Sequence, residues 1–149
     1  TRFSDSDKVI EEQAGCTIAA LFERDGEETF RRLESEILAD LLSLSGVVAT
    51  GGGVVLRPDN RDLLRAAAHC IYLRVPARTL MARLRRNTKR PLLLVADPER
   101  RLQELLVERQ PLYEEVATAI VDTAGLSLVD VVEAVVKSCR PSRPQPVER

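Results

Sequence analysis

A short apolar run meets three consecutive glycines in Val47-Val48-Ala49-Thr50-Gly51-Gly52-Gly53-Val54-Val55. Such a run of β-forming residues predicts a buried strand, and glycines at its carboxyl end let the backbone turn sharply and approach a ligand closely. In parallel α/β sheets, ligands bind at this edge of the sheet. A tight turn without a ligand is the alternative, so the stretch alone predicts a strand and leaves a binding site open.

A long amphipathic helix is expected directly before the glycine stretch. From residue 27 to about residue 43, apolar side chains recur at intervals of three and four, which predicts a helix with one face packed inward. The expected inward positions are Phe30, Leu33, Ile37, Leu38, Leu41 and Leu42.

Helices and strands alternate along the rest of the chain. Helices are expected at residues 5–15, 18–24, 58–68, from 76, from 97 to about 110 with a break at Pro111 before 112–118, and 127–137. Strands are expected at residues 1–4, 70–75 and 119–122, and a loop at 87–94. This alternation predicts an α/β fold, a parallel β-sheet flanked by helices on both faces.

Composition limits the classes of protein that fit. With 149 residues, 44% of them hydrophobic, we expect one domain at residues 1–139 and a disordered, proline-rich tail at 140–149. The net charge of -1 gives no basic field for nucleic acid or membrane, and no apolar run approaches 18 residues. Three cysteines without C-x-x-C spacing indicate neither a disulfide framework nor a zinc site, which favours a cytoplasmic protein.

Two carboxylates and one ion pair are candidates for a site near the glycines. Asp5 and Asp7 follow a predicted strand; on an extended segment they would point to opposite sides, where one could hold a magnesium water and the other a hydroxyl group. Helix capping is the alternative for both. Arg31 and Glu34 lie three residues apart on the predicted helix and can form an ion pair, which we expect to be solvated.

Three arginines lie where a cation could face a bound anion. Arg109 precedes the expected break at Pro111, although the helix dipole alone favours arginine there. Arg83 and Arg90 flank or lie within the expected loop, where a closing lid could bring them onto a phosphoryl group; a merely soluble loop is the alternative. Tyr113 is expected to serve packing rather than chemistry.

Five short blocks, taken in order, resemble shikimate kinases. They are Phe3-x-Asp5-x-Asp7, Phe30-Arg31-Arg32-x-Glu34, Ala49-Thr50-Gly51-Gly52-Gly53, Arg90-Pro91-Leu92-Leu93 and Arg109-x-Pro111-x-Tyr113, and the resemblance covers roughly residues 3–136. It implies a P-loop kinase-like three-layer sandwich. It also implies transfer of the γ-phosphoryl group of ATP to the 3-hydroxyl of shikimate, in the pathway to chorismate and the aromatic amino acids.

The resemblance implies an acceptor site for shikimate. Asp7 would hold and deprotonate the attacking hydroxyl group, and Arg31 and Arg109 would grip the substrate carboxylate. The backbone of Gly51, Gly52 and Gly53 would lie close to the ring hydroxyls. Two bidentate arginines and an aspartate suit a small carboxylate that carries several hydroxyl groups.

The resemblance also implies a nucleotide site. Arg90 would be the lid arginine on the ATP phosphates, with a catalytic role, and Arg83 would stack on adenine. Asp5 would reach Mg²⁺ through water. The expected partners are shikimate and ATP, Mg²⁺ is the expected cofactor, and a monomer is the expected state.

The phosphate-binding loop of the family has no counterpart within these residues. That loop ends in Gly-Lys-Ser/Thr, but none of Lys8, Lys89 and Lys137 follows a glycine. We therefore expect a chain that is N-terminally truncated relative to the family, missing its first strand and Walker A loop, with little or no kinase activity alone. A catalytically inert shikimate-binding module and a related small-molecule kinase, such as a gluconate kinase, are the alternatives.

Overall fold

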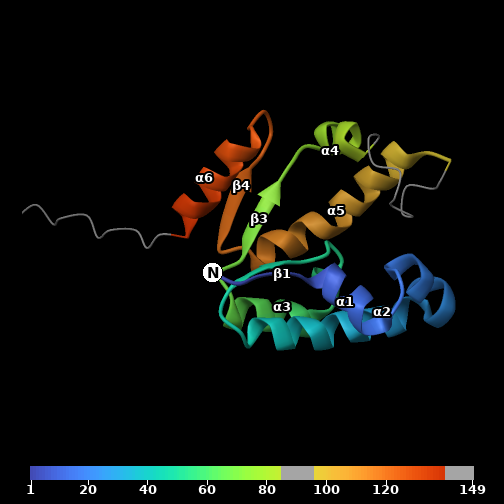
Figure 1. The fold of residues 1–149 in the computed structure, drawn as a ribbon. Coiled ribbons are helices and arrows are strands. Elements are labelled where there is room, and N and C mark those ends of the chain that lie inside the picture. Colours follow the sequence, from blue (N-terminus) through green and yellow to red (C-terminus); the bar gives the residue numbers. More distant parts are fainter. Residues whose placement is uncertain (85–95, 140–149) are drawn as a thin grey trace, which may run out of the picture.

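The computed structural model describes residues 1–84 and 96–139 (Figure 1). The elements, in chain order, are β1 (Phe3–Asp5), α1 (Ser6–Ala14), α2 (Ile18–Leu42), β2 (Val47–Ala49), the 3₁₀ turn η1 (Val54–Leu56), α3 (Pro58–Ala67), β3 (Ile71–Arg74), α4 (Ala77–Leu84), α5 (Pro98–Val116), β4 (Ala119–Asp122) and α6 (Leu128–Ser138). The loop predicted at 87–94 and the tail predicted at 140–149 lie outside the described residues.

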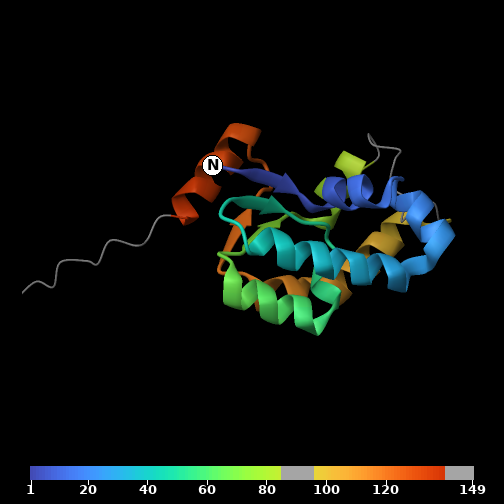
Figure 2. The same cartoon turned by 60° about the horizontal axis from the view of Figure 1, so that its bottom comes forward.

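The strands form two parallel pairs. β1 pairs with β2, placing Phe3 opposite Val47, and β3 pairs with β4, placing Ile71 opposite Ala119. Within the described residues the two pairs share no strand neighbour. Figure 2 shows β1 and β2 side by side along α2. The prediction of parallel strands flanked by helices is confirmed.

The strand before the glycines is less buried than predicted. Val47 is 55% exposed, and of the three residues of β2 only Val48 is half-buried. Parallel strands are buried when they have neighbours on both sides and helices on both faces, whereas β2 has β1 as its one strand neighbour in the described chain. The prediction of a fully buried strand is therefore wrong.

Capping residues fix the helix ends where the sequence predicts them. Asp5 caps α1, which ends at Gly15 in the left-handed conformation, with φ of +68°. Thr17 caps α2, and the predicted break at Gly26 is a kink with φ of +81° inside that helix. Both glycines hold backbone conformations that other residues adopt only with strain.

The predicted break at Pro111 is wrong, because α5 continues through that residue as far as Val116. Proline removes one N–H donor and so frees the carbonyl of Val107, one turn earlier. Val107 is 79% exposed, so water can reach this part of the helix. Arg109 consequently lies within a continuous helix and not at its end.

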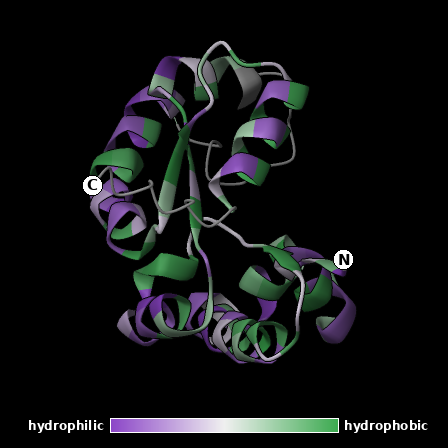
Figure 3. Ribbon diagram, turned by 90° about the vertical axis from the view of Figure 1, so that its left-hand side faces the viewer, coloured by the Kyte–Doolittle hydropathy of each residue, from purple (hydrophilic) through white to green (hydrophobic). Residues whose placement is uncertain are grey.

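The two core clusters are formed mainly by helices and η1, and Val48 of β2 packs against the first of them. One cluster joins α1 to α2, and a second joins α2 to η1, α3 and α5. Of the six positions predicted to face inward on the long helix, four are buried, and Leu33 and Leu42 are partly buried. The helices carry both hydrophobic and hydrophilic residues, as amphipathic helices do (Figure 3).

Candidate functional site

The glycine loop, residues 51–53, follows β2 and is closely surrounded by side chains from three helices. A Cβ atom at its first glycine would lie 2.8 Å from Oδ1 of Asp7. One at the second would lie 2.9 Å from the hydroxyl of Tyr113, and one at the third would overlap the guanidinium group of Arg31. A Cβ atom at any of the three positions would therefore require a neighbouring side chain to move.

The glycine loop does not use the conformational freedom expected of glycine. None of its three residues is among the glycines with positive φ, and Gly53 has φ of -82°. The chain does turn here as predicted, since the N–H of Val54 donates to the carbonyl of Gly51 at 3.3 Å, but the turn does not need a positive φ. The predicted close approach to a ligand stays a prediction. The tight approach is to protein side chains from α1, α2 and α5.

Hydrogen bonds tie the glycine loop to its surroundings. The N–H of Gly51 donates to Oγ of Ser6, at 3.3 Å, and Ser6 is buried. The carbonyl of Gly52 accepts from the Tyr113 hydroxyl, at 2.7 Å. Within the described part of the chain, the N–H groups of Gly52 and Gly53 have no acceptor. Two backbone donors of the loop are thus available to a ligand.

η1, which follows the glycine loop, is fixed by α3. Nδ2 of the buried Asn60 donates to the carbonyl of Val54, at 2.9 Å, and Nη1 of Arg61 donates to the carbonyl of Val55, at 2.8 Å. Val54 and Val55 are themselves buried in the second core cluster. The chain leaving the glycine loop is therefore anchored to α3 by hydrogen bonds and to the core by packing.

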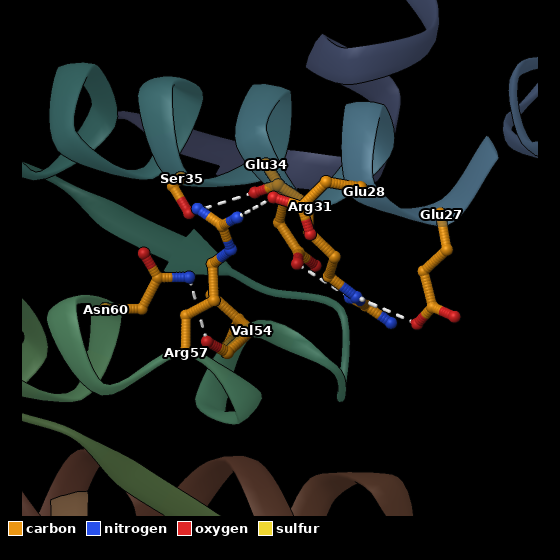
Figure 4. Close-up of polar contacts among 8 residues, drawn as sticks. All are labelled: Glu27, Glu28, Arg31, Glu34, Ser35, Val54, Arg57 and Asn60. Atoms are coloured by element: carbon orange, nitrogen blue, oxygen red, sulfur yellow. Dashed lines mark hydrogen bonds and ion pairs between the residues drawn. The ribbon is translucent and has the colours of Figure 1, made fainter. Parts of the chain in front are cut away.

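Arg31 lies on α2 in an ion pair with Glu34, which the spacing predicted. Its Nη1 lies 2.7 Å from Oε2 of Glu34, and its Nε lies 3.4 Å from Oε1 of Glu27 (Figure 4). The side chain of Glu34 is only 2% exposed and that of Arg31 13%. The prediction of a solvated pair is wrong, because position 34 falls on the inward face of α2, one turn after the buried Phe30.

Burial raises the pKa of Glu34 above its ordinary value, because desolvation penalises the ionised form. The hydrogen bond and charge of Arg31 act in the opposite direction, as does the charge of Arg109, while the charge of Asp7 adds to the increase. The ionisation of Glu34 is therefore coupled to the charges of Arg31, Arg109 and Asp7. It holds Arg31 in place from within the protein.

Arg109 reaches the glycine loop from α5. Its Nη1 would lie 3.9 Å from a Cβ atom at Gly52. Its buried Nε has no hydrogen-bond acceptor, and among the described residues its guanidinium forms no ion pair. A buried N–H without an acceptor costs free energy, which an anionic ligand could recover through bidentate hydrogen bonds.

Asp5 caps α1, as the capping alternative predicted, whereas Asp7 lies inside that helix. The helix α1 begins at Ser6, so the two carboxylates do not share an extended segment. Oδ1 of Asp5 accepts from the N–H of Asp7, at 3.0 Å, and of Lys8, at 3.4 Å, as a helix cap. The cap uses Oδ1 of Asp5 and not Oδ2, while the Asp7 carboxylate faces the glycine loop.

The structure does not test the placement of the two arginines predicted to contact the nucleotide. Arg83 lies in α4, and at this residue the structure describes only the helical backbone. Arg90 lies outside the described residues. In residues 1–84 and 96–139, no group of three or more His, Cys, Asp or Glu side chains could hold a metal ion.

Tyr113 and Glu34 contact the glycine loop and Arg31 in ways that the sequence did not predict. Tyr113 follows Arg109 by four residues in α5, and side chains at this spacing share one face of a helix. That spacing could have placed the hydroxyl beside the arginine at the site. Glu34 stands among the apolar positions of the long helix, and a carboxylate in such a position is the signal that it is buried.

Comparison with known proteins decides the family of this chain. The family described as shikimate kinase matches residues 1–140. This chain belongs to the shikimate kinase family. A shikimate kinase of Thioalkalivibrio sulfidiphilus is 46% identical over 134 residues, covering 89% of this chain and 70% of the relative. One of Halorhodospira halophila is 45% identical over 137 residues, covering 91% and 77%.

A solved structure supports the same family. The shikimate kinase from Acinetobacter baumannii in complex with shikimate has a TM-score of 0.86 and 38% sequence identity, covering 91% of this chain and 76% of that one. The family agrees with the α/β architecture and with the order of the five sequence blocks. No described helix is both long and apolar enough to cross a membrane.

Proposed function

We propose that this member of the shikimate kinase family binds shikimate between α1, α2 and α5, in contact with the glycine loop. The observation that carries the proposal is the convergence of Asp7, Arg31 and Arg109 on that loop. The three side chains come from separate parts of the chain. The similar Acinetobacter baumannii enzyme, whose structure is a complex with shikimate, supports the choice of ligand.

Each group of the proposed site suits one part of shikimate. The guanidinium groups of Arg31 and Arg109 bind the ring carboxylate, because Glu34 occupies only part of Arg31 and Arg109 has no carboxylate of its own among the described residues. The N–H groups of Gly52 and Gly53, which have no acceptor among the residues that the structure describes, face the ring hydroxyls. This leaves Asp7 beside the hydroxyl that reacts.

The proposed reaction is transfer of the γ-phosphoryl group of ATP to the 3-hydroxyl of shikimate. The hydroxyl oxygen forms a bond to the γ-phosphorus, the bond to the bridging oxygen of ADP breaks, and the hydroxyl proton passes to the Asp7 carboxylate. The role of the protein in this step is to position the acceptor and to hold the proton. Arg90 and Arg83 are proposed to contact ATP.

Asp5 fits a part in Mg²⁺ binding, although the described carboxylates alone form no cage. In phosphotransferases Mg²⁺ is held by one or two carboxylates, waters and the phosphates of the substrate, and it neutralises the phosphate charge. Oδ2 of Asp5 is not used by the helix cap and could contact one of those waters. The cysteine spacing further supports a cytoplasmic location.

Binding of shikimate is the appropriate test, because the 149 residues contain no Gly-Lys-Ser/Thr sequence and we expect little or no turnover from them alone. Shikimate is titrated calorimetrically into the folded chain and into an Arg109→Ala variant. Arg100→Ala is the matched control, since Arg100 lies on the same helix, is 76% exposed and pairs with Glu104.

We expect the chain to bind shikimate and the Arg109→Ala variant to bind it about 10- to 100-fold more weakly, from loss of charged hydrogen bonds. Arg100→Ala should bind as the unaltered chain does. Equal affinities for the two variants would contradict the role of Arg109. Absence of heat from a folded chain would contradict the proposed acceptor.

A further inference from the structure

Tyr113 connects the helix that carries Arg109 to the glycine loop. Its hydroxyl donates to the carbonyl of Gly52 at 2.7 Å, across 61 residues of sequence. Tyr113 and Arg109 lie four residues apart on α5 and both approach the same glycine. This contact therefore sets the distance between the loop and the arginine.

The ring of Tyr113 is held from its other side. It contacts the ring of Tyr72 on β3, with 5.0 Å between the ring centroids, and packs against the buried cluster that includes Val54 and Val55. A ring fixed in this way directs its hydroxyl to one place. The hydrogen bond to Gly52 is therefore made by a preorganised donor.

The peptide group between Gly52 and Gly53 transmits this contact. In a trans peptide the carbonyl oxygen of one residue and the N–H of the next point in opposite directions within one plane. Fixing the Gly52 carbonyl toward α5 thus fixes the N–H of Gly53, which has no acceptor among the described residues. A hydrogen bond to the carbonyl also strengthens the N–H as a donor.

We propose that Tyr113 is a positioning residue of the acceptor site, which orients the Gly53 N–H toward a ligand oxygen and holds Arg109 at a fixed distance from the glycine loop. This inference rests on the proposed function, because the ligand oxygen belongs to shikimate. Glycine at position 52 is part of the same arrangement, since a Cβ atom there would lie 2.9 Å from the Tyr113 hydroxyl oxygen.

The test compares Tyr113→Phe with Tyr72→Phe, which removes a hydroxyl from the other ring of the same pair. Shikimate affinity is measured by calorimetry and folding by thermal unfolding. We expect Tyr113→Phe to weaken shikimate binding about two- to tenfold, as for loss of one hydrogen bond, and Tyr72→Phe to change it less than about twofold. The amide proton resonance of Gly53 should move in Tyr113→Phe even without shikimate.

A second pair of variants separates positioning from general stability. Gly52→Ala should weaken binding strongly beside Tyr113 but much less in the Tyr113→Phe background, where the nearest atoms to the new Cβ are 3.9 Å and 4.0 Å away. Unchanged shikimate affinity in Tyr113→Phe, whether or not its unfolding temperature is lowered, would overturn this inference and leave the proposed function standing. No shikimate binding by the unaltered folded chain would overturn the proposed function and this inference with it.

Discussion

The helices beside the two strand pairs of this protein are packed very differently. The first pair, β1 and β2, lies against α1 and α2, where Ile10 and Leu38 are almost completely buried. The second pair, β3 and β4, carries α6, in which no residue is buried. Four apolar side chains of α6 are strongly exposed: Leu128 at 80%, Val129 at 65%, Val132 at 53% and Val136 at 48%.

This difference separates the proposed acceptor site from the rest of the molecule. The residues around the glycine loop are backed by a packed core and by buried polar contacts, such as that of Glu34 with Arg31. Packed surroundings restrict rotamers and so preorganise a site. We infer that the acceptor site is ordered before a ligand arrives, whereas α6 adds little to its geometry.

The largest expected effect compares the same substitution in the two regions. Leu38→Ala removes a side chain that is 1% exposed, and Leu128→Ala one that is 80% exposed. Leu38→Ala should lower the free energy of unfolding by about 2–5 kcal/mol through lost burial and a residual cavity. Leu128→Ala should change it by less than about 0.5 kcal/mol. Urea unfolding measures both, and similar losses would contradict the contrast between the regions.

A smaller effect is expected from adding one methyl group to the glycine loop. In Gly53→Ala the new Cβ would overlap the Arg31 guanidinium, so the arginine must move. We expect shikimate affinity to fall about tenfold, the scale of overpacking a tight site. Calorimetric titration measures the change.

The same substitution in an Arg31→Ala background is the control for Gly53→Ala. If displacement of Arg31 is the cause, adding Gly53→Ala there should change affinity little, because the clash is gone. Equal losses with and without Arg31 would show that the loop acts independently of the arginine.

The smallest effect concerns the pH dependence of stability, with opposite signs in the two regions. Burial raises the pKa of Glu34, so its stabilising contribution is complete below its ordinary pKa and is lost as pH rises through the raised one. Arg74 lowers the pKa of Asp122, whose contribution is present above its ordinary pKa and is lost as pH falls through the lowered one.

Glu34→Gln should therefore remove a decrease in stability with rising pH, and Asp122→Asn should remove an increase. Urea midpoints measured from acidic to neutral pH give the two slopes. The change for Asp122→Asn should be the smaller one, because its pair with Arg74 is solvent-exposed. Identical pH profiles for Glu34→Gln and the unaltered chain would contradict the burial of this charge.

Local features of the structure could be predicted from the sequence. The helix cap at Asp5 depends on neighbouring residues, and it occurs where the sequence places it. The kink at Gly26 likewise needs only the backbone freedom of glycine. Parallel strand pairing followed from the alternation of helices and strands.

Contacts between distant segments could not be predicted in this way. The burial of Glu34 depends on which face of α2 meets the glycine loop, and the bond from Tyr113 to Gly52 depends on how α5 packs. The break expected at Pro111 is absent, because tertiary packing and solvent access let the helix continue through this residue. Spacing within a helix shows which residues share a face but not what that face contacts.

The most direct test of the acceptor site is a titration of shikimate into the ¹⁵N-labelled chain, followed by amide chemical shifts. We predict the largest shift changes at residues 51–53, together with the side-chain Nε–H resonances of Arg31 and Arg109. Amides of α6 should change little. Shift changes concentrated in β4 and α6, with the glycine loop unaffected, would contradict the placement of shikimate between α1, α2 and α5.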